Sequence, residues 1–310
     1  MTVNVLFSAS NERWLEYQKP LDSAFTKSGI SANLSADFAS SEVDYIVYAP
    51  NGPIKDFTPF TKLKAVLGLW AGVETVVDNP TLTVPMTRMV DSGLREGMVE
   101  WVTGHVLRYH LGIDAHITGQ NGEWKPVYPP LARNRRVGIL GLGELGSACA
   151  KALATLNFQV CGWSRTQKEI AGIKCFSGEK GLEDTLAQSE ILVLLLPLTP
   201  TTENLMNEQR LAMMPKGARL LNPGRGALID DDALLKALNS GHIAHATLDT
   251  FRVEPLPKDH PYWAHKQVTV TPHLASETRA DTSAKVIAEN IRRFEAGEEM
   301  LFVVDRSTGY

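Results

Sequence analysis

Three side chains in the last third of the sequence, Arg225, Glu254 and His273, together carry anion-binding and acid–base chemistry. A guanidinium binds a carboxylate or a polarised carbonyl oxygen, and an imidazole donates a proton near neutral pH. A carboxylate beside the imidazole fixes its orientation and favours its charged form. The set matches the needs of 2-oxo acid reduction. Alone, Arg225 could be a surface residue, Glu254 a loop end and His273 a helix cap, so the hypothesis rests on their joint occurrence.

Each of these side chains follows an apolar stretch that predicts a β-strand. The three segments span residues 222–230, 248–256 and 271–278. In open α/β sheets, ligands bind beyond the carboxyl ends of parallel strands. The sequence therefore predicts that the three side chains gather at one edge of a sheet.

A glycine-rich turn precedes these segments. Residues 137–140 are apolar, and Gly141, Gly143 and Gly146 follow as Gly-x-Gly-x-x-Gly, with a helical stretch beginning near Glu144 and Leu145. Glycines permit a tight turn and let the backbone approach a pyrophosphate, which lies at the positive end of the next helix. The strand before the motif and the helix after it are the context that dinucleotide binding requires. The alternative is an ordinary glycine turn.

The end of the next predicted strand, after Trp163, bears on cofactor choice. NAD-binding proteins usually carry an acidic residue there for the ribose hydroxyls. This sequence has none at that point and instead places Ser164, Arg165, Thr166 and Lys168 there. Such groups suit a 2′-phosphate, because arginine offers bidentate charge-assisted bonds. We expect NADPH to be preferred and NADH to be less favoured; the alternative is a solvated basic loop.

Two further assignments concern the nicotinamide. Asp249 is expected to receive its amide, and Leu196, Pro197 and Thr202 to line its pocket. The alternative is that these apolar strand ends face only the core.

The elements that position these residues alternate between strands and helices, as in an α/β fold with parallel sheets. Apolar periodicity predicts long helices near residues 94–111 and 281–296. The predicted strands span residues 3–7, 45–48, 65–69, 137–140, 159–163, 191–196, 219–222, 245–249 and 268–271. The denser strand series lies between the two helices. This predicts one domain inserted into another, with the helices as crossover points.

Composition excludes several classes of protein. The chain has 310 residues, a length typical of two domains, and a net charge of −4, which argues against a nucleic-acid binder. Its three cysteines match no metal motif, so we expect reduced thiols and no metal. The N-terminus lacks the basic region of a signal peptide, and no apolar run approaches the ~20 residues that span a bilayer. We expect a cytoplasmic protein.

The glycine turn and the three segments at 222–230, 248–256 and 271–278, in this order and spacing, closely resemble the motifs of the D-isomer-specific 2-hydroxyacid dehydrogenase family. The similarity covers nearly the whole chain. The resemblance implies that Arg225, Glu254 and His273 are catalytic. It implies a smaller, flavodoxin-like α/β catalytic domain formed by both chain ends (residues 1–100 and 281–310). An inserted Rossmann NAD(P)-binding domain would span residues 101–280. It also implies a homodimer.

Within the family, the sequence looks like the bacterial glyoxylate/hydroxypyruvate reductases of the A type, which implies reduction of glyoxylate or hydroxypyruvate. The loop of Trp70, Ala71, Gly72 and Val73 would then bind the substrate carboxylate through backbone N–H groups. Other family members, acting on lactate or phosphoglycerate, remain alternatives, although residues 65–77 contain no Arg or Lys for a phosphorylated substrate. A dinucleotide-sensing corepressor is the alternative from another class.

Trp124 and Thr250 are two further positions of interest. Trp124-Lys-Pro resembles a segment that reaches into the partner's active site in related eukaryotic glyoxylate reductases. It would then exclude larger substrates, unless Trp124 simply packs on its own domain. Thr250 stands where the family usually has an aliphatic residue, and we expect little effect.

Overall fold

The structure, a computed structural model, describes residues 2–306 and 309. Two compact units make up the chain. Unit 1 contains residues 1–94 and 277–310, and unit 2 contains residues 95–276. The chain leaves unit 1 within the first turn of helix α2 (Ser92–Leu111) and re-enters it just before helix α8 (Ala280–Glu295). The predicted boundary at residue 100 falls inside α2.

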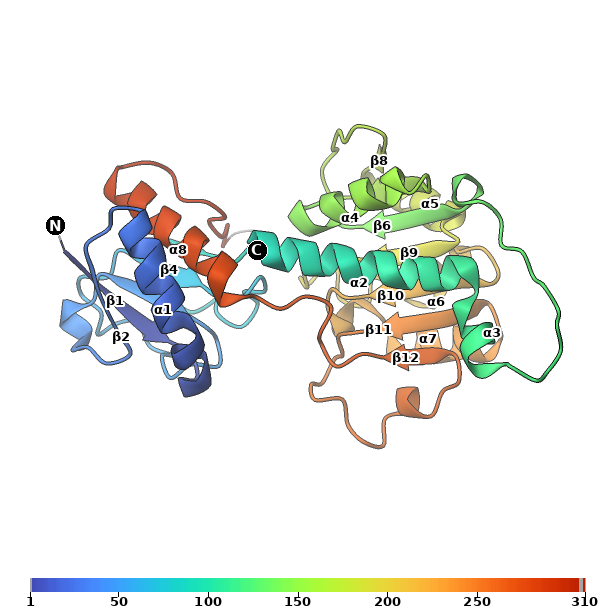
Figure 1. Ribbon diagram of the computed structural model, residues 1–310, viewed down its shortest axis with the longest axis horizontal. Coiled ribbons are helices and arrows are strands. Elements are labelled where there is room, and N and C mark those ends of the chain that lie inside the picture. The colour runs from blue at the N-terminus through green and yellow to red at the C-terminus, as the bar shows by residue number, and fades with distance from the viewer. Residues whose placement is uncertain (1, 307–308, 310) are drawn as a thin grey trace. The chain divides into compact units, whose positions relative to one another are not determined.

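Unit 1 is built on a five-stranded parallel sheet of order β2-β1-β3-β4-β5, the flavodoxin-like order. Its elements are β1 (Val3–Ser8), α1 (Asn11–Lys27), β2 (Ala32–Ser35), η1 (Ser40–Glu42), β3 (Tyr45–Tyr48), β4 (Ala65–Gly68), β5 (Met86–Thr87) and α8. Strand residues alternate between two cores: Tyr45 and Val47 face α1 and α8, which lie together in Figure 1. Ile46 and Tyr48 face the opposite side.

That opposite side of the sheet contacts loops. The buried residues there include Val73, Val76, Val77 and Leu82 from the segment after β4, and Val304 from the segment after α8. One face of the unit 1 sheet is thus covered by loops instead of helices, and the loops are held in place by their contacts with the sheet and with one another.

Unit 2 is a doubly wound domain. All seven strands are parallel, in the order β12-β11-β10-β9-β6-β7-β8. Its strands are β6 (Arg136–Leu140), β7 (Gln159–Trp163), β8 (Lys174–Phe176), β9 (Ile191–Leu194), β10 (Ala218–Asn222), β11 (Ile243–Leu248) and β12 (Val268–Val270). Read from β6, this is the Rossmann order, and the direction of winding reverses between β6 and β9.

Helices cover both faces of this sheet (Figure 1). Residues of α2 and α4 pack on one face, and residues of α5, α6 and α7 pack on the other. The remaining elements are α3 (Ile113–Thr118), η2 (Ala132–Asn134), α4 (Glu144–Thr155), α5 (Gly178–Gln188), α6 (Glu208–Met213), η3 (Gly226–Leu228), α7 (Asp231–Asn239) and η4 (Pro261–Trp263). The predicted helix near residues 94–111 is α2, whose buried stripe consists of Met98, Val102, Val106 and Tyr109.

The structure confirms the α/β class, with two parallel sheets, and it corrects some details. The apolar run at 191–196 predicts a strand over its whole length, but β9 ends at Leu194. Leu196 is buried in the core instead. The strands that periodicity missed, β2, β5 and β8, are short and lie at or near sheet edges.

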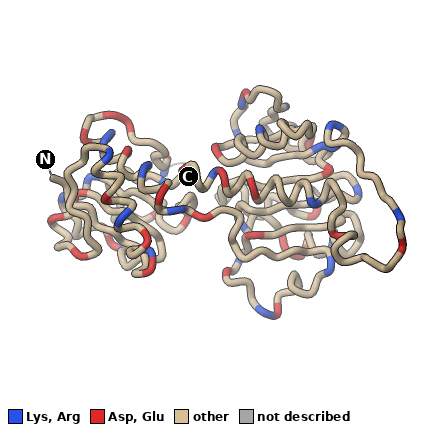
Figure 2. The backbone as a smooth tube through the Cα atoms, viewed as in Figure 1, with Lys and Arg blue, Asp and Glu red and all other residues tan. Residues whose placement is uncertain are grey.

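Charged residues of both signs are interspersed along the backbone of both units (Figure 2). Among the described residues, no helix is both long enough and apolar enough to cross a bilayer.

Candidate active site

The glycine turn lies between β6 and α4, where the winding of unit 2 reverses. Gly141 has a φ of 105°, and a Cβ there would lie 2.4 Å from the carbonyl oxygen of Leu195. A Cβ on Gly146 would lie 1.7 Å from Gly141 O, so the helix approaches the turn too closely for any side chain. Gly143, the N-cap of α4, is exposed and has open space around its Cβ position. The turn therefore fits a pyrophosphate at the N-terminus of α4.

Beyond β7, the basic loop is held by polar side chains. The Ser164 hydroxyl donates to Thr166 O at 2.8 Å, and Ser164 is buried. Gln167 donates from its amide to the carbonyls of Cys175 and Lys168, and its oxygen accepts from the Ser177 hydroxyl at 2.9 Å. Arg165, Thr166 and Lys168 are exposed. The role of Gln167 was not predicted from the sequence, because two of its partners, Cys175 and Ser177, lie in or directly after β8, a strand that periodicity did not reveal.

The loop after β9 closes on itself. The Thr202 hydroxyl donates to Pro197 O at 2.7 Å and accepts from the N–H of Thr199 at 2.8 Å. Leu196 is 8% exposed. Pro197 and Thr202 therefore lie in one ordered loop beyond the carboxyl end of β9, and Leu196 packs mainly in the core.

Arg225 follows β10 through a turn fixed by a buried amide. The Asn222 side chain donates to Arg225 O at 2.9 Å, and its oxygen accepts from the N–H of Gly224 at 3.2 Å. A Cβ on Gly226 would lie 2.0 Å from the carbonyl carbon of Phe251, so the backbones of two successive strand ends touch. The Asn-x-x-Arg-Gly pattern thus combines an amide that shapes the turn with a glycine that admits its neighbour.

Glu254 and His273 form a hydrogen bond between the loops after β11 and β12. The Glu254 Oε2 and His273 Nδ1 atoms lie 2.7 Å apart, and Glu254 Oε1 accepts from the N–H of Phe251 at 2.8 Å. His273 Nε2 forms no hydrogen bond with another residue in the described part of the chain. The geometry therefore turns one ring nitrogen to the carboxylate and leaves the other for a ligand.

The backbone around His273 is held by Asp249. His273 has a φ of 52°, and its N–H donates to Asp249 O at 2.8 Å. The Asp249 carboxylate, fully buried, accepts from the N–H groups of Leu274 and Ala275 and from the Thr271 hydroxyl. A carboxylate has about four lone-pair sites. A contact with a nicotinamide amide would therefore use the one that remains, so Asp249 primarily fixes the histidine turn.

The buried Thr250 places its hydroxyl 3.5 Å from Asn222 O, a contact that an aliphatic side chain would not make.

In unit 1, the loop from Trp70 to Val73 follows β4. Trp70 is 43% exposed and Val73 is buried. The N–H groups of Ala71, Gly72 and Val73 donate no hydrogen bond to another residue within 2–306 or 309. Trp124 is 100% exposed, in the loop after α3.

Comparisons with known proteins agree on one family. Residues 105–275 match the model of the D-isomer specific 2-hydroxyacid dehydrogenase NAD binding domain. Glyoxylate/hydroxypyruvate reductase A of Serratia proteamaculans is 40% identical over 257 residues, which are 80% of this chain and 82% of that protein.

Similar solved structures belong to the same family. A D-isomer specific 2-hydroxyacid dehydrogenase from Xanthobacter autotrophicus, in complex with NADPH and MES, is 42% identical over 100% of both chains, with a TM-score of 0.92. An NADPH-dependent glyoxylate/hydroxypyruvate reductase from Sinorhizobium meliloti, in complex with NADP and sulfate, is 33% identical over 100% of this chain and 99% of that one, with a TM-score of 0.87.

Together with these comparisons, a Rossmann unit with its glycine turn intact and a second α/β unit identify an NAD(P)-dependent oxidoreductase. The chain belongs to the D-isomer-specific 2-hydroxyacid dehydrogenase family. Its reaction is the interconversion of a 2-oxo acid and a 2-hydroxy acid.

Proposed function

We propose that the chain is an NADPH-preferring reductase of small 2-oxo acids, converting glyoxylate to glycolate and hydroxypyruvate to glycerate. The observation that carries the proposal is the 2.7 Å pair of His273 Nδ1 and Glu254 Oε2, which leaves Nε2 as a proton donor. The substrates are those in the names of the Serratia and Sinorhizobium relatives. Both nucleotide complexes quoted above contain NADPH or NADP.

The bound cofactor would supply a hydride to the carbonyl carbon of the oxo acid. His273 Nε2 then gives its proton to the carbonyl oxygen, and Glu254 stabilises the charged ring before the transfer. Arg225 binds the carboxylate and the polarised carbonyl, where its charge opposes the negative charge that develops on oxygen. Hydride and proton together convert the ketone or aldehyde to an alcohol.

We propose that the turn of Gly141, Gly143, Glu144, Leu145 and Gly146 binds the pyrophosphate of the cofactor. Ser164, Arg165, Thr166 and Lys168 would bind the 2′-phosphate. Leu196, Pro197, Thr202 and Asp249 would surround the nicotinamide. The open space at Gly143 and the cationic loop that Gln167 anchors support this assignment. Unit 2 is then the cofactor-binding domain and unit 1 the substrate-binding domain.

The substrate carboxylate is proposed to bind the loop of Trp70, Ala71, Gly72 and Val73. Three successive N–H groups without hydrogen-bond partners among the described residues form a concentrated donor set for an anion. Side-chain charge is not needed there, because backbone donors alone can bind a carboxylate.

A substrate panel tests the function. Oxidation of NADPH and of NADH is followed with glyoxylate, hydroxypyruvate, pyruvate and phenylpyruvate. We expect the highest kcat/KM for NADPH with glyoxylate or hydroxypyruvate. Preference for pyruvate would favour a lactate-type dehydrogenase, and nucleotide binding without turnover would favour a sensing protein.

We also propose a homodimer in which Trp124 closes the partner's pocket. Unit 2 exposes a run of large apolar side chains around α3, which is typical of an interaction surface. They are Leu111, Ile117, Trp124, Val127, Tyr128 and Leu131. Light scattering should give twice the 34.0 kDa chain mass, and Trp124→Ala should raise activity on phenylpyruvate. A monomeric enzyme would contradict the dimer, and unchanged selectivity would remove Trp124 from the pocket.

A further inference from the structure

The segment Phe302–Arg306, which follows α8, joins the edge of the unit 1 sheet. Val304 donates from its N–H to Met86 O at 2.8 Å, and Arg88 donates to Phe302 O at 3.0 Å. Thr87 and Val303 form an antiparallel bridge. Val304 is buried in the core on the loop-covered face of the sheet. The segment therefore extends the sheet beyond β5.

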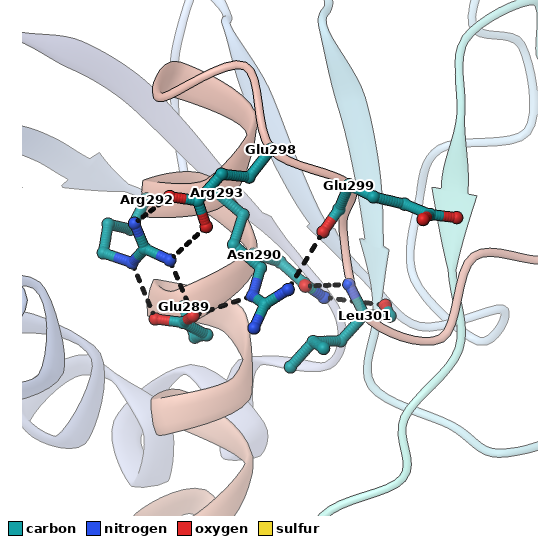
Figure 3. Close-up of polar contacts among 7 residues, drawn as sticks. All are labelled: Glu289, Asn290, Arg292, Arg293, Glu298, Glu299 and Leu301. Carbon is teal, nitrogen blue, oxygen red and sulfur yellow. Dashed lines mark hydrogen bonds and ion pairs between the residues drawn. The ribbon is translucent and has the colours of Figure 1, made fainter.

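The entry to this segment is fixed at the end of α8 (Figure 3). Asn290, 1% exposed, accepts from the N–H of Leu301 at 2.7 Å and donates to Leu301 O at 3.2 Å. Arg293 donates to Glu299 O at 3.2 Å, so two helix side chains hold the connecting turn. The path from α8 to Arg306 is thus held at both ends.

Arg306 binds three backbone carbonyls of the loop after the substrate-binding residues. Its Nε donates to Val77 O at 2.8 Å, one terminal nitrogen donates to Asn79 O at 2.8 Å, and the other contacts Leu82 O. A guanidinium offers five donors in a planar fork, which suits three converging oxygens. A lysine ammonium cannot reproduce that fork.

The clamped loop is continuous with the substrate-binding loop. Val76 and Val77 donate from their N–H groups to Val73 O, at 3.0 and 2.9 Å, in a single helical turn. Val73, Val76 and Val77 are all buried in the same core as Val304. A shift of Val77 O would therefore move the turn that starts at Val73.

We propose that Arg306 is a positioning residue for substrate binding. It holds the turn from Val73 to Val77, and through it the N–H groups of Ala71, Gly72 and Val73 that bind the carboxylate. This rests on the proposed function of that loop. Arg306 acts only through the loop, so its loss weakens binding of the oxo acid and leaves cofactor binding unchanged.

The test compares Arg306→Lys and Arg306→Gln with Arg292→Lys as the matched control. Arg292 lies on α8 in the same unit and pairs with Glu289 and Glu298, carboxylates that lysine can also pair with (Figure 3). Both Arg306 variants should raise KM for glyoxylate about tenfold, with kcat changed by less than about twofold. The dissociation constant of NADPH should not change, and the control should behave as wild type.

Hydrogen exchange separates the inference from the function on which it rests. Amide exchange at Val76 and Val77, whose N–H groups donate to Val73 O, should accelerate in both Arg306 variants, while exchange in α8 stays unchanged. Ala71→Pro, which removes one N–H, tests the loop directly. If Ala71→Pro raises KM and the Arg306 variants do not, the inference is wrong and the loop stands. If exchange accelerates and no variant raises KM, the loop does not bind substrate. If amide exchange in the loop is unchanged in the Arg306 variants, Arg306 does not hold the loop and the inference is wrong.

Discussion

The two units carry their proposed chemistry in different forms. Unit 2 holds all eight histidines and all three cysteines of the chain, and its candidate groups are side chains at strand ends. Unit 1 has neither residue type, and its candidate site is three backbone N–H groups in a loop. Side-chain chemistry leaves residue types in the sequence, whereas backbone chemistry depends on conformation. Variants should therefore affect the two units differently.

The largest effect is expected at His273. His273→Ala removes the proton donor, which should lower kcat by about 10²–10⁴ while NADPH still binds. Steady-state rates and fluorescence titration of NADPH measure the two quantities. His265→Ala, a change to a histidine of unit 2 that contacts Asn239, is the control. Turnover that survives in His273→Ala would remove the residue from the mechanism.

Arg225 should affect both binding and turnover. Arg225→Ala should raise KM for the oxo acid and lower kcat, because the guanidinium contacts ground and transition states. Arg225→Lys keeps the charge but loses the fork, so kcat/KM should fall by about tenfold to a hundredfold. Arg210→Lys is the control, because Arg210 of α6 pairs with Glu179 of α5. An effect on KM alone would restrict Arg225 to binding.

Arg165 should affect only one cofactor. A charge-assisted contact with phosphate contributes about 1.5–3 kcal/mol, so Arg165→Ala should lower kcat/KM for NADPH about tenfold to a hundredfold. NADH kinetics should change little, and Lys180→Ala should change neither. The assay needs low salt, because exposed charges are screened. If the wild type uses NADH equally well, the preference for NADPH is wrong.

The smallest effect concerns pH and stability. Burial, with Arg108 and Arg219 adding repulsion and Asp114 opposing it, lowers the pKa of His245 to about 4. The unfolded state, with a histidine pKa of about 6.5, takes up the proton first as pH falls. Unit 2 should therefore lose stability from about pH 6.5 to about pH 4, and no further through this group.

His245→Gln should remove part of the loss of stability between about pH 6.5 and about pH 4. Burial also lowers the pKa values of His105 and His110, so some dependence will persist. Hydrogen exchange measured separately in each unit gives the readout, and unit 1, without histidine, is the internal reference. If the free energy of unfolding of unit 2 changes with pH equally in wild type and His245→Gln, His245 does not contribute to the pH dependence.

The sequence by itself determined the α/β class, the central strands of both sheets and the two long helices. It also identified Arg225, Glu254 and His273 as candidates, because each of these residue types follows a predicted apolar strand. The apolar pattern was sufficient where a strand is buried throughout, as in β3, or where a helix buries a continuous stripe, as in α2. It failed at β2, β5 and β8, because short strands at or near an edge bury too little apolar surface to impose a pattern.

Only the tertiary structure decided how the candidates are held. The 2.7 Å approach of Glu254 to His273 joins two loops, and Asp249 fixes the histidine turn from another strand end. The contacts of Gln167 with β8 and of Arg306 with three carbonyls likewise join residues far apart in sequence. A hydrogen bond to a backbone carbonyl imposes no residue type on its acceptor. Such contacts leave no sequence pattern and emerge only once the chain has folded.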